Sequence, residues 1–356
     1  MNPGAVGQPP VRVLVVDDSA AQRGALVALI NADAELTVIG WAANGADAAR
    51  ATALLKPDVI AMDLRMPVMD GLEATRRILQ ETPTPIVLVT GGSDGAYGDQ
   101  QRLAFEALEA GVLAVLRKPG PGSAGRAATQ ELYRTLKSMA QVKVVRRWSG
   151  DRLRPTPTGN GPAPSASPGV RLEVVAIGAS TGGPPVLRTI LVGLPSAFTA
   201  PVLIVQHIAD DFAVSLVDWL RPQCALPIEM GVDGQALNRP GIFVAPPGRH
   251  MGVRGRAVAL VDGPPISLHR PSATHLFQSV AREYGRAALG VLLTGMGDDG
   301  AVGLRDCKRA GATTVAQDES TSVVFGMPAA AISLGVVDHV APPQAIVSIL
   351  LQRSRA

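Results

Sequence analysis

The sequence predicts two doubly wound α/β domains joined by a linker. Residues 11–118 alternate short β-branched, apolar runs with helical patterns, the same alternation begins again at residue 172, and a stretch rich in Pro, Gly and Ser separates the two. Repeated strand-helix-strand units are typical of a parallel sheet covered by helices on both faces. At 356 residues, the chain is also too long for one ordinary core.

Five strands are predicted in the first domain, which we place at residues 11–141. The strand-like runs are VRVLVV (11–16), LTVIGWA (36–42), PDVIAMD (57–63), PIVLVT (85–90) and VLAVLRK (112–118). Helical segments such as DGLEATRRILQET separate them, and a last helix is expected over about 125–141. The pattern predicts a five-stranded parallel sheet.

Residues 142–171 are predicted to form a flexible linker. The stretch SGDRLRPTPTGNGPAPSASPGV has few large apolar residues and cannot build a core. The whole chain has a net charge of +3, and the basic excess lies in this linker, which carries six Lys and Arg against one acidic residue. Residues 172–356 carry fourteen of each sign. This distribution argues against nucleic-acid binding as the main function.

The second domain, placed at residues 172–356, is predicted to be another doubly wound α/β fold with a β-hairpin insertion. Strands are expected at LEVVAIG (172–178), APVLIVQ (200–206), GIFVAPP (241–247), AALGVLLT (287–294), ATTVA (312–316) and GVVDHV (335–340). Helices are expected at about 183–193, 211–221, 273–285, 299–310, 328–334 and 342–353. The run HMGVRGRAVALVD predicts the hairpin, with its turn at Arg254-Gly255.

No targeting or membrane segment is predicted. No run approaches the roughly eighteen apolar residues that span a bilayer, and residues 1–10 lack the basic start and apolar core of a signal peptide. The expected location is the cytoplasm. Cys224 and Cys307 are too far apart in sequence for a metal-binding motif, and we expect both to be buried or inert.

Carboxylates follow two strands of the first domain. Asp17 and Asp18 end the first strand, and Asp63 ends the third. The carboxyl ends of central parallel strands converge on one crevice, where three like charges repel unless a cation lies among them. Mg²⁺ suits such oxygen ligands and accepts phosphate beside them. Thr90 and Lys118 end the fourth and fifth strands, where a hydroxyl and an ammonium group can hold a phosphoryl group.

The pattern VVDDS, MDLRMPVMDG, T and KP resembles the receiver domains of two-component response regulators over residues 11–141. The resemblance implies a flavodoxin-like (βα)5 fold in which Asp63 accepts the phosphoryl group. It implies that Asp18, Asp63 and the Arg65 carbonyl bind Mg²⁺. Asp17 is implied to take part through water.

The same resemblance implies that Thr90 and Lys118 contact the phosphoryl oxygens, and that a sensor histidine kinase is the phosphodonor. One position departs from the family pattern. Val115 stands where the family usually has an aromatic residue that reorients on phosphorylation. The sequence therefore leaves that part of the switch without its usual residue.

A lone hydroxyl follows the first strand of the second domain. VVAIGASTGGPP places Ser180 in a G-x-S-x-G pattern between a strand and a helix, which exposes a nucleophile on a tight turn. The following helix directs free N–H groups and its positive end toward a developing oxyanion. Two alternatives are a simple helix cap and a dinucleotide fingerprint. In the fingerprint, Ser180 would replace the middle glycine, and Gln206-His207 would stand where a ribose-binding acid belongs.

His207 is the predicted general base. It follows Ser180 by one helix and one strand, so it ends the adjacent strand at the same edge of the sheet. A third group should orient the imidazole and stabilise its charged form. The run LGVLLTGMGDDG brings Asp298 and Asp299 to that edge, and the spacing leaves both open.

Residues 172–352 resemble the catalytic domain of chemotaxis-type protein-glutamate methylesterases. The motifs are AIGASTGGP, IVQH, RPGIFVAPPGRHM, HRPSATHLFQSVA, LLTGMGDDG and AQDESTSVVFGMP. The resemblance implies a Rossmann-like hydrolytic domain with Ser180 as nucleophile, His207 as base and Asp299 as acid. Thr181 and the Met296 backbone N–H are implied to complete the oxyanion hole.

The resemblance further implies the reaction and its partners. A serine hydrolase of this kind, activated by phosphorylation of its receiver, removes methyl esters from glutamates on the cytoplasmic helices of chemoreceptors and deamidates receptor glutamines. We expect no cofactor for the esterase domain, no nucleic-acid partner and no membrane insertion. At the rim of the site, Thr274-His275 departs mildly from the family form.

Two other functions remain open on the sequence. The second domain could be a receptor-docking adaptor without turnover, or a hydrolase of small esters, because a triad sets the chemistry and the rim sets the substrate. A transcription factor is disfavoured, since no helix-turn-helix with a basic face follows the linker.

Overall fold

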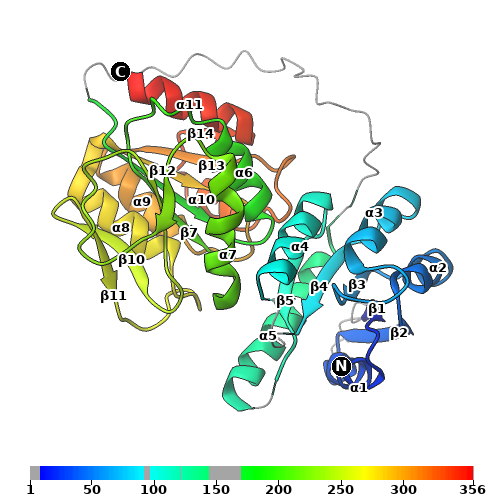
Figure 1. Ribbon diagram of the computed structural model, residues 1–356. Helices are drawn as coiled ribbons and strands as arrows, with labels where there is room; N and C mark the ends of the chain where they lie inside the picture. The colour runs from blue at the N-terminus through cyan, green and yellow to red at the C-terminus, as the bar shows by residue number, and fades with distance from the viewer. Residues whose placement is uncertain (1–8, 92–96, 121, 143, 145–169, 356) are drawn as a thin grey trace, which may run out of the picture. The chain divides into compact units, whose positions relative to one another are not determined.

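The computed structural model describes residues 9–91, 97–120, 122–142, 144 and 170–355. The chain divides into two compact units, Met1–Arg154 and Pro155–Ala356. Each unit is built around its own parallel sheet (Figure 1). Most of the predicted linker, 142–171, lies outside the described residues.

Five strands and five helices alternate in the first unit. The strands are β1 (Val11–Val16), β2 (Leu36–Ala42), β3 (Val59–Met62), β4 (Ile86–Thr90) and β5 (Ala114–Arg117). The helices are α1 (Ala20–Asn31), α2 (Gly45–Leu55), α3 (Gly71–Glu81), α4 (Tyr97–Ala110) and α5 (Gly122–Met139). The strand order β2-β1-β3-β4-β5 is flavodoxin-like, which confirms the predicted fold class.

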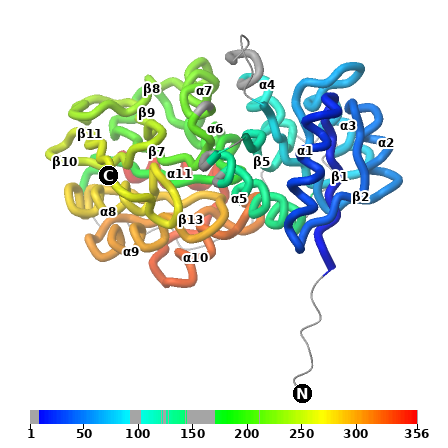
Figure 2. Tube along the Cα trace, turned by 90° about the horizontal axis from the view of Figure 1, so that it is seen from below, coloured from blue at the N-terminus to red at the C-terminus, as the bar shows by residue number. Residues whose placement is uncertain are grey.

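Helices cover both faces of this sheet. On one face α1 and α5 lie side by side (Figure 2), where the Tyr133 hydroxyl donates to the Leu29 carbonyl at 2.7 Å. On the other, α2, α3 and α4 pack against one another in sequence. Because both faces are covered, β3 and β4 are buried along their whole length, which explains their continuous apolar sequences.

The second unit has a larger parallel sheet. Its strands are β6 (Val174–Ala179), β7 (Val202–Gln206), β8 (Ile228–Met230), β9 (Ile242–Val244), β12 (Ala288–Leu292), β13 (Thr313–Gln317) and β14 (His339–Ala341), and their order is β14-β13-β12-β6-β7-β9-β8. Its helices are α6 (Gly183–Val192), α7 (Asp210–Leu220), α8 (Ala273–Tyr284), α9 (Ala301–Arg309), α10 (Met327–Ser333) and α11 (Pro343–Arg355), with short 3₁₀ turns at Arg221–Gln223 and Gly285–Ala287.

The helices of this unit also lie on both faces of the sheet. The crossover through α6 runs from β6 to β7, whereas the crossover through α9 runs the opposite way across the sheet, from β12 to β13. Right-handed crossovers in opposite directions place these helices on opposite faces. Helix α8 packs against α9, and α11 packs against α6 (Figure 1).

The predicted hairpin is present. Strands β10 (His250–Arg254) and β11 (Ala257–Val261) pair antiparallel, with the turn at Gly255-Arg256, one residue later than predicted. The hairpin packs on α8, where the Ser279 hydroxyl accepts a hydrogen bond from the Val253 N–H at 3.0 Å.

One strand was not predicted, and another was predicted to begin too early. The three-residue edge strand β8 was missed, because a run as short as IEM has no readable alternation. The predicted strand over 335–340 begins only at His339. Gly335 instead closes the end of α10 with φ +66°, and Val336 packs into the core.

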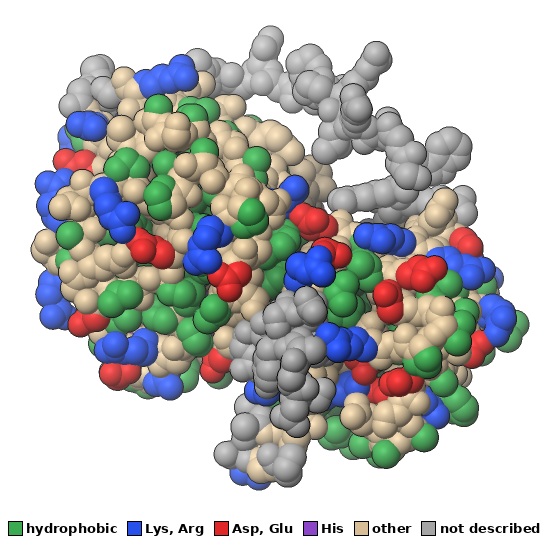
Figure 3. Space-filling model, in the orientation of Figure 1, with side chains coloured by type: hydrophobic (Ala, Val, Ile, Leu, Met, Phe, Trp, Pro, Cys, Tyr) green, Lys and Arg blue, Asp and Glu red, His purple; other side chains and the backbone are tan. Residues whose placement is uncertain are grey.

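Charges of both signs are interspersed on the face of the second unit seen in Figure 3. This agrees with the equal numbers of basic and acidic residues in 172–356. None of the described helices has the length and apolar character needed to span a lipid bilayer.

Candidate phosphorylation site and candidate active site

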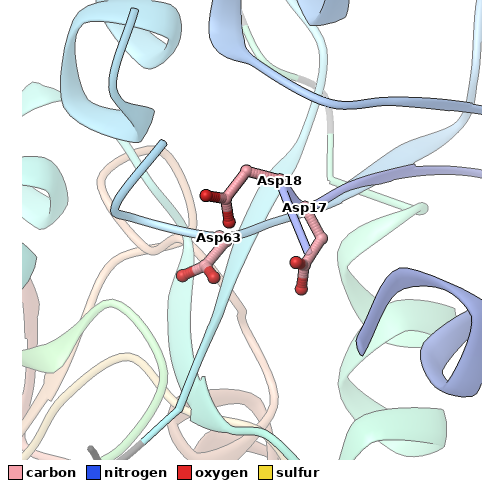
Figure 4. A group of neighbouring side chains, drawn as sticks. All are labelled: Asp17, Asp18 and Asp63. Carbon is pink, nitrogen blue, oxygen red and sulfur yellow. The ribbon is translucent and has the colours of Figure 1, made fainter. Parts of the chain in front are cut away.

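Three carboxylates meet at the carboxyl edge of the first sheet (Figure 4). Asp17 and Asp18 follow β1, and Asp63 follows β3. One oxygen of each lies within 4.8 Å of the others. Asp17 is fully buried, Asp63 is 9% exposed and Asp18 faces solvent. The structure therefore brings together the trio predicted from the strand ends.

Lys118 neutralises part of this acidic cluster. Its Nζ lies 2.7 Å from Asp17 Oδ2 and 2.5 Å from Asp63 Oδ2. Burial raises the pKa of Asp63, and the nearby Asp17 carboxylate adds to the rise, although the Lys118 ammonium opposes it. Burial lowers the pKa of Lys118, but its hydrogen bonds to the two carboxylates outweigh that effect and raise it overall.

The remaining predicted residues of this site lie around the same edge. Thr90, 3% exposed, ends β4 next to Lys118, whose backbone N–H donates to the Thr90 carbonyl at 2.9 Å. Arg65 is exposed in the loop between β3 and α3. Val115 is half-buried within β5 and pairs in register with Leu88 of β4.

The chemistry of the acidic cluster suits a divalent cation. All three side chains offer oxygen atoms, the donors that Mg²⁺ prefers. The Lys118 ammonium already lies between Asp17 Oδ2 and Asp63 Oδ2, at 2.7 Å and 2.5 Å, so these carboxylates attract positive charge at this edge, and Asp18 faces solvent beside them. A bound cation would also relieve the repulsion between the carboxylates.

The carboxyl ends of β6, β7 and β12 form the second candidate site. In the sheet, β6 lies between β7 and β12. The chain continues from β6 to β7 on one side and later adds β12 on the other side of β6, so the strand order reverses at β6. Such a reversal of strand order is where open α/β sheets bind their ligands. Ser180 directly follows β6 and is 8% exposed.

The turn that carries Ser180 is held by backbone and side-chain contacts. The Ser180 N–H donates to the Thr294 carbonyl at 3.0 Å, and the Ser180 carbonyl accepts from the Gly183 N–H at 2.8 Å. Gly182 has φ +76°, and a Cβ there would lie 2.5 Å from Val323 Cβ. Only glycine therefore fits the step from the serine into α6.

The imidazole of His207 lies beside a buried carboxylate. His207 Nε2 is 2.9 Å from Asp299 Oδ2, and Asp299 is 1% exposed. Burial would raise the pKa of Asp299, but hydrogen bonding to His207, the charge of His207 and the Ser272 hydroxyl at 2.7 Å hold it well below its usual range. Asp299 also accepts the first backbone N–H groups of α8, from Ala273 at 2.7 Å and Thr274 at 3.1 Å.

Asp298, the other acid left open by the spacing, has a different environment. Its side chain is exposed, and its carbonyl accepts from the Ala301 N–H at 3.0 Å, at the start of α9. Of the two acids, it is Asp299 that faces the imidazole.

Of the two predicted oxyanion residues, Thr181 directly follows the serine and Met296 lies in the loop after β12. Thr181 is half-buried, and its carbonyl accepts from the Thr294 hydroxyl at 3.0 Å. Met296 is half-buried in the loop after β12. A Cβ on the preceding Gly295 would lie 2.7 Å from Ser180 Cβ, so this loop passes directly against the serine.

Sequence reasoning did not single out two side chains of this site. The His269 ring stacks on His207 with centroids 3.8 Å apart and planes inclined by 4°. Gln206 donates from Nε2 to the Ser180 and His207 carbonyls, each at 2.8 Å. His269 belongs to the family motif HRPSATHLF and Gln206 to IVQH, but the spacing of residues in the sequence predicts neither contact.

The class of protein follows from these two units. A receiver-type sheet with an acidic edge accompanies an α/β unit that carries a serine turn and an imidazole-carboxylate pair at its ligand-binding edge. Together they define a hydrolase with a response-regulator receiver. Family models match both parts, the response regulator receiver domain over residues 13–130 and the CheB methylesterase over residues 175–350. The chain belongs to the CheB methylesterase family.

Relatives extend the match over nearly the whole chain. A protein-glutamate methylesterase/protein-glutamine glutaminase of Syntrophus aciditrophicus is 44% identical over 346 residues, covering 96% of this chain and 98% of the relative. One from Myxococcus xanthus is 46% identical over 340 residues, covering 93% of each. The crystal structure of the Thermotoga maritima CheB methylesterase catalytic domain matches with a TM-score of 0.50 and 35% identity, covering 51% of this chain and 99% of that one.

Proposed function

We propose that this chain is a protein-glutamate methylesterase, activated by phosphorylation of Asp63, that hydrolyses glutamate methyl esters on the cytoplasmic helices of chemoreceptors. The observation that carries the proposal is the 2.9 Å contact of His207 with Asp299 at the sheet edge that also presents Ser180. The names of the relatives support the substrate, and also a second activity, deamidation of glutamine.

The catalytic residues act in a fixed order. Because Nε2 of His207 faces Asp299, Nδ1 is the nitrogen that takes the Ser180 hydroxyl proton as Oγ attacks the ester carbonyl. Asp299 stabilises the imidazolium that forms. The tetrahedral intermediate collapses, the carbon–oxygen bond of the ester breaks, and methanol leaves with the proton from Nδ1.

The second half of the reaction restores the enzyme. His207 removes a proton from water, the water oxygen attacks the glutamyl ester of Ser180, and the serine leaves with that proton. The backbone N–H of Met296 and Thr181 are the proposed donors to the oxyanion in both halves. Losing one such donor typically costs roughly 3 kcal/mol of transition-state stabilisation.

The receiver is proposed to supply the regulation. Asp63 accepts the phosphoryl group from a sensor histidine kinase, and Thr90 and Lys118 contact its oxygens. Asp17, Asp18, Asp63 and the Arg65 carbonyl would hold Mg²⁺, which when bound neutralises charge on the phosphoryl group. Lys118 already bridges Asp17 and Asp63, and its ammonium group would pair with the added negative charge of the phosphoryl group.

The unphosphorylated receiver is proposed to cover the Ser180 crevice and to exclude a large helical substrate. Phosphorylation of Asp63 would then open the site, and the long linker permits both arrangements. Comparing the full chain with residues 172–356 tests this step. If removal of the receiver leaves the basal rate unchanged, blocking is wrong.

The direct test of the function is methanol release from methylated receptor membranes, with and without acetyl phosphate. Release should rise with the phosphodonor and vanish in Ser180→Ala, while Asp63 phosphorylation persists in that variant. Release that survives in Ser180→Ala would require another nucleophile. Release that is absent from the wild type would favour a docking adaptor.

A further inference from the structure

We propose that Gln206 is a positioning residue that ties the nucleophile turn to the general base. The inference rests on the proposed function, because it gives Gln206 a role in the reaction of Ser180 and His207. Gln206 is the last residue of β7, is 5% exposed, and directly precedes His207 in the chain.

One carboxamide group bridges the two residues. Gln206 Nε2 lies 2.8 Å from the Ser180 carbonyl and 2.8 Å from the His207 carbonyl. A carbonyl oxygen can only accept, so both N–H groups of the amide are used and its orientation is determined by its partners. The side chain thus links the backbones of the two reacting residues directly.

The bridge lies where strand pairing stops. The last residue pair of β6 and β7 is Ala179 with Gln206. The His207 N–H still donates to the Ala179 carbonyl at 2.9 Å, but Ser180 has already turned into the loop before α6. The Gln206 amide supplies the next cross-strand hydrogen bond, and it extends the β6–β7 link by one residue to the nucleophile itself.

The Ser180 peptide is consequently held from both neighbouring strands. Its N–H donates toward β12, to the Thr294 carbonyl, and its carbonyl accepts from Gln206 on the β7 side. Removing Gln206 would leave the Ser180 contacts with Thr294 and Gly183 and would take away its hydrogen bond from β7. The distance between the Ser180 and His207 backbones would then be less well defined. Proton transfer between the two side chains requires a well-defined distance.

Gly183 makes the room that this amide occupies. A Cβ at residue 183 would lie 2.1 Å from Gln206 Oε1 and 3.0 Å from Ala179 Cβ. Gln206 Oε1 is buried without a hydrogen-bond partner among the described residues. The amide therefore keeps its place through its two N–H groups and the space left by glycine.

The test measures how fast and how completely a fluorophosphonate probe labels Ser180 in the full chain. The Ser180 oxygen displaces fluoride from phosphorus, so the reaction needs the positioned serine and base but no receptor. Gln206→Met keeps the volume and removes both hydrogen bonds. Gln206→Glu replaces the donating NH₂ group by a carboxylate oxygen, which can only accept and therefore repels the Ser180 and His207 carbonyls. Gln278→Met is the matched control, because Gln278 donates to Asp306 Oδ2 at 3.0 Å between α8 and α9.

A positioning role lowers the rate of labelling and leaves its endpoint complete. For Gln206→Met we expect a rate roughly ten- to a hundredfold lower, a full endpoint and a wild-type rate in Gln278→Met. Gln206→Glu should be at least as slow as Gln206→Met. A reduced endpoint with a normal rate in the labelled fraction would mean that Gln206 only stabilises the fold, and would overturn the proposal.

Gly183→Ala tests the same bridge without changing Gln206. Its added methyl group must displace the Gln206 amide, so labelling should again be slow and complete. A wild-type rate in both Gly183→Ala and Gln206→Met would refute the positioning role. Failure of the probe to label wild-type Ser180 would instead count against the proposed function, so the two failures are distinguishable.

Discussion

Asp299 Oδ2 lies 2.9 Å from Nε2 of His207, while Nδ1 of the same ring is buried without a hydrogen-bond partner among the described residues. The two ring nitrogens therefore have different surroundings. In the neutral imidazole, the carboxylate accepts a hydrogen bond from Nε2–H, and the lone pair of the ring is then on Nδ1. The acid determines the tautomer as well as the position of the ring.

The tautomer can be tested by replacing Asp299 with Asn. The amide of Asp299→Asn can donate to Nε2, which favours a proton on Nδ1 and leaves no base for Ser180. We expect methanol release to fall by about 10⁴-fold in kcat. Asp298→Asn, at the exposed neighbour, should retain the wild-type rate. Equal losses in the two variants would contradict the assignment of Asp299.

The flat ring of His269, which stacks on His207, should increase turnover by holding the imidazole of His207 in place. His269→Ala removes the ring that lies 3.8 Å from His207, so the base loses its support on one face. We expect kcat to fall about tenfold in this variant. His269→Phe keeps a flat ring and should restore most of the rate. If His269→Phe is as slow as His269→Ala, flat packing is not what His269 contributes.

Asp338 should make stability depend on pH in the acid range. Burial would raise its pKa, but Lys308 and the Thr314 N–H at 2.9 Å outweigh burial and hold the pKa below 3.8. A lowered pKa stabilises the fold above pH 3.8, and this contribution is lost as pH falls toward the folded-state value.

Urea unfolding at pH 5 and pH 3 measures this contribution. The wild type should lose a few tenths to about 1 kcal/mol more than Asp338→Asn over that interval. Identical pH dependence in the two proteins would show that Asp338 is not stabilised as a carboxylate.

Both cysteines should resist alkylation in the folded protein. Burial raises the pKa of Cys224 to about 11, and burial together with the Asp306 charge raises that of Cys307 to about 12. At pH 8 only about 0.1% or less of either thiol is then thiolate, the reactive form. Intact mass after iodoacetamide treatment should show no adduct, and two adducts after unfolding in urea. Rapid modification of the folded protein would contradict this environment.

Much of the architecture could be predicted because a local pattern encodes it. Fully buried strands such as β3 and β4 are continuous apolar runs, and strands of a parallel sheet all end at one edge. That rule was enough to predict that Asp17 lies near Asp63, and that Ser180 lies at the same sheet edge as His207. The rule does not extend to β8, whose three residues become a strand only by pairing with β9.

Periodicity and strand ends were enough to predict the two α/β units, the edge of each sheet that carries the candidate site residues, and the residue types found there. The spacing left Asp298 and Asp299 open, the family resemblance implied Asp299, and the tertiary structure supplies the physical reason for that choice. The two acids are adjacent in the chain, and the choice depends on the start of α8, where the Ser272 hydroxyl and two backbone N–H groups surround Asp299. The contacts of Gln206 and His269 also became visible only in the tertiary structure. They join segments that are distant in the sequence, and no local sequence pattern predicts that these segments lie together.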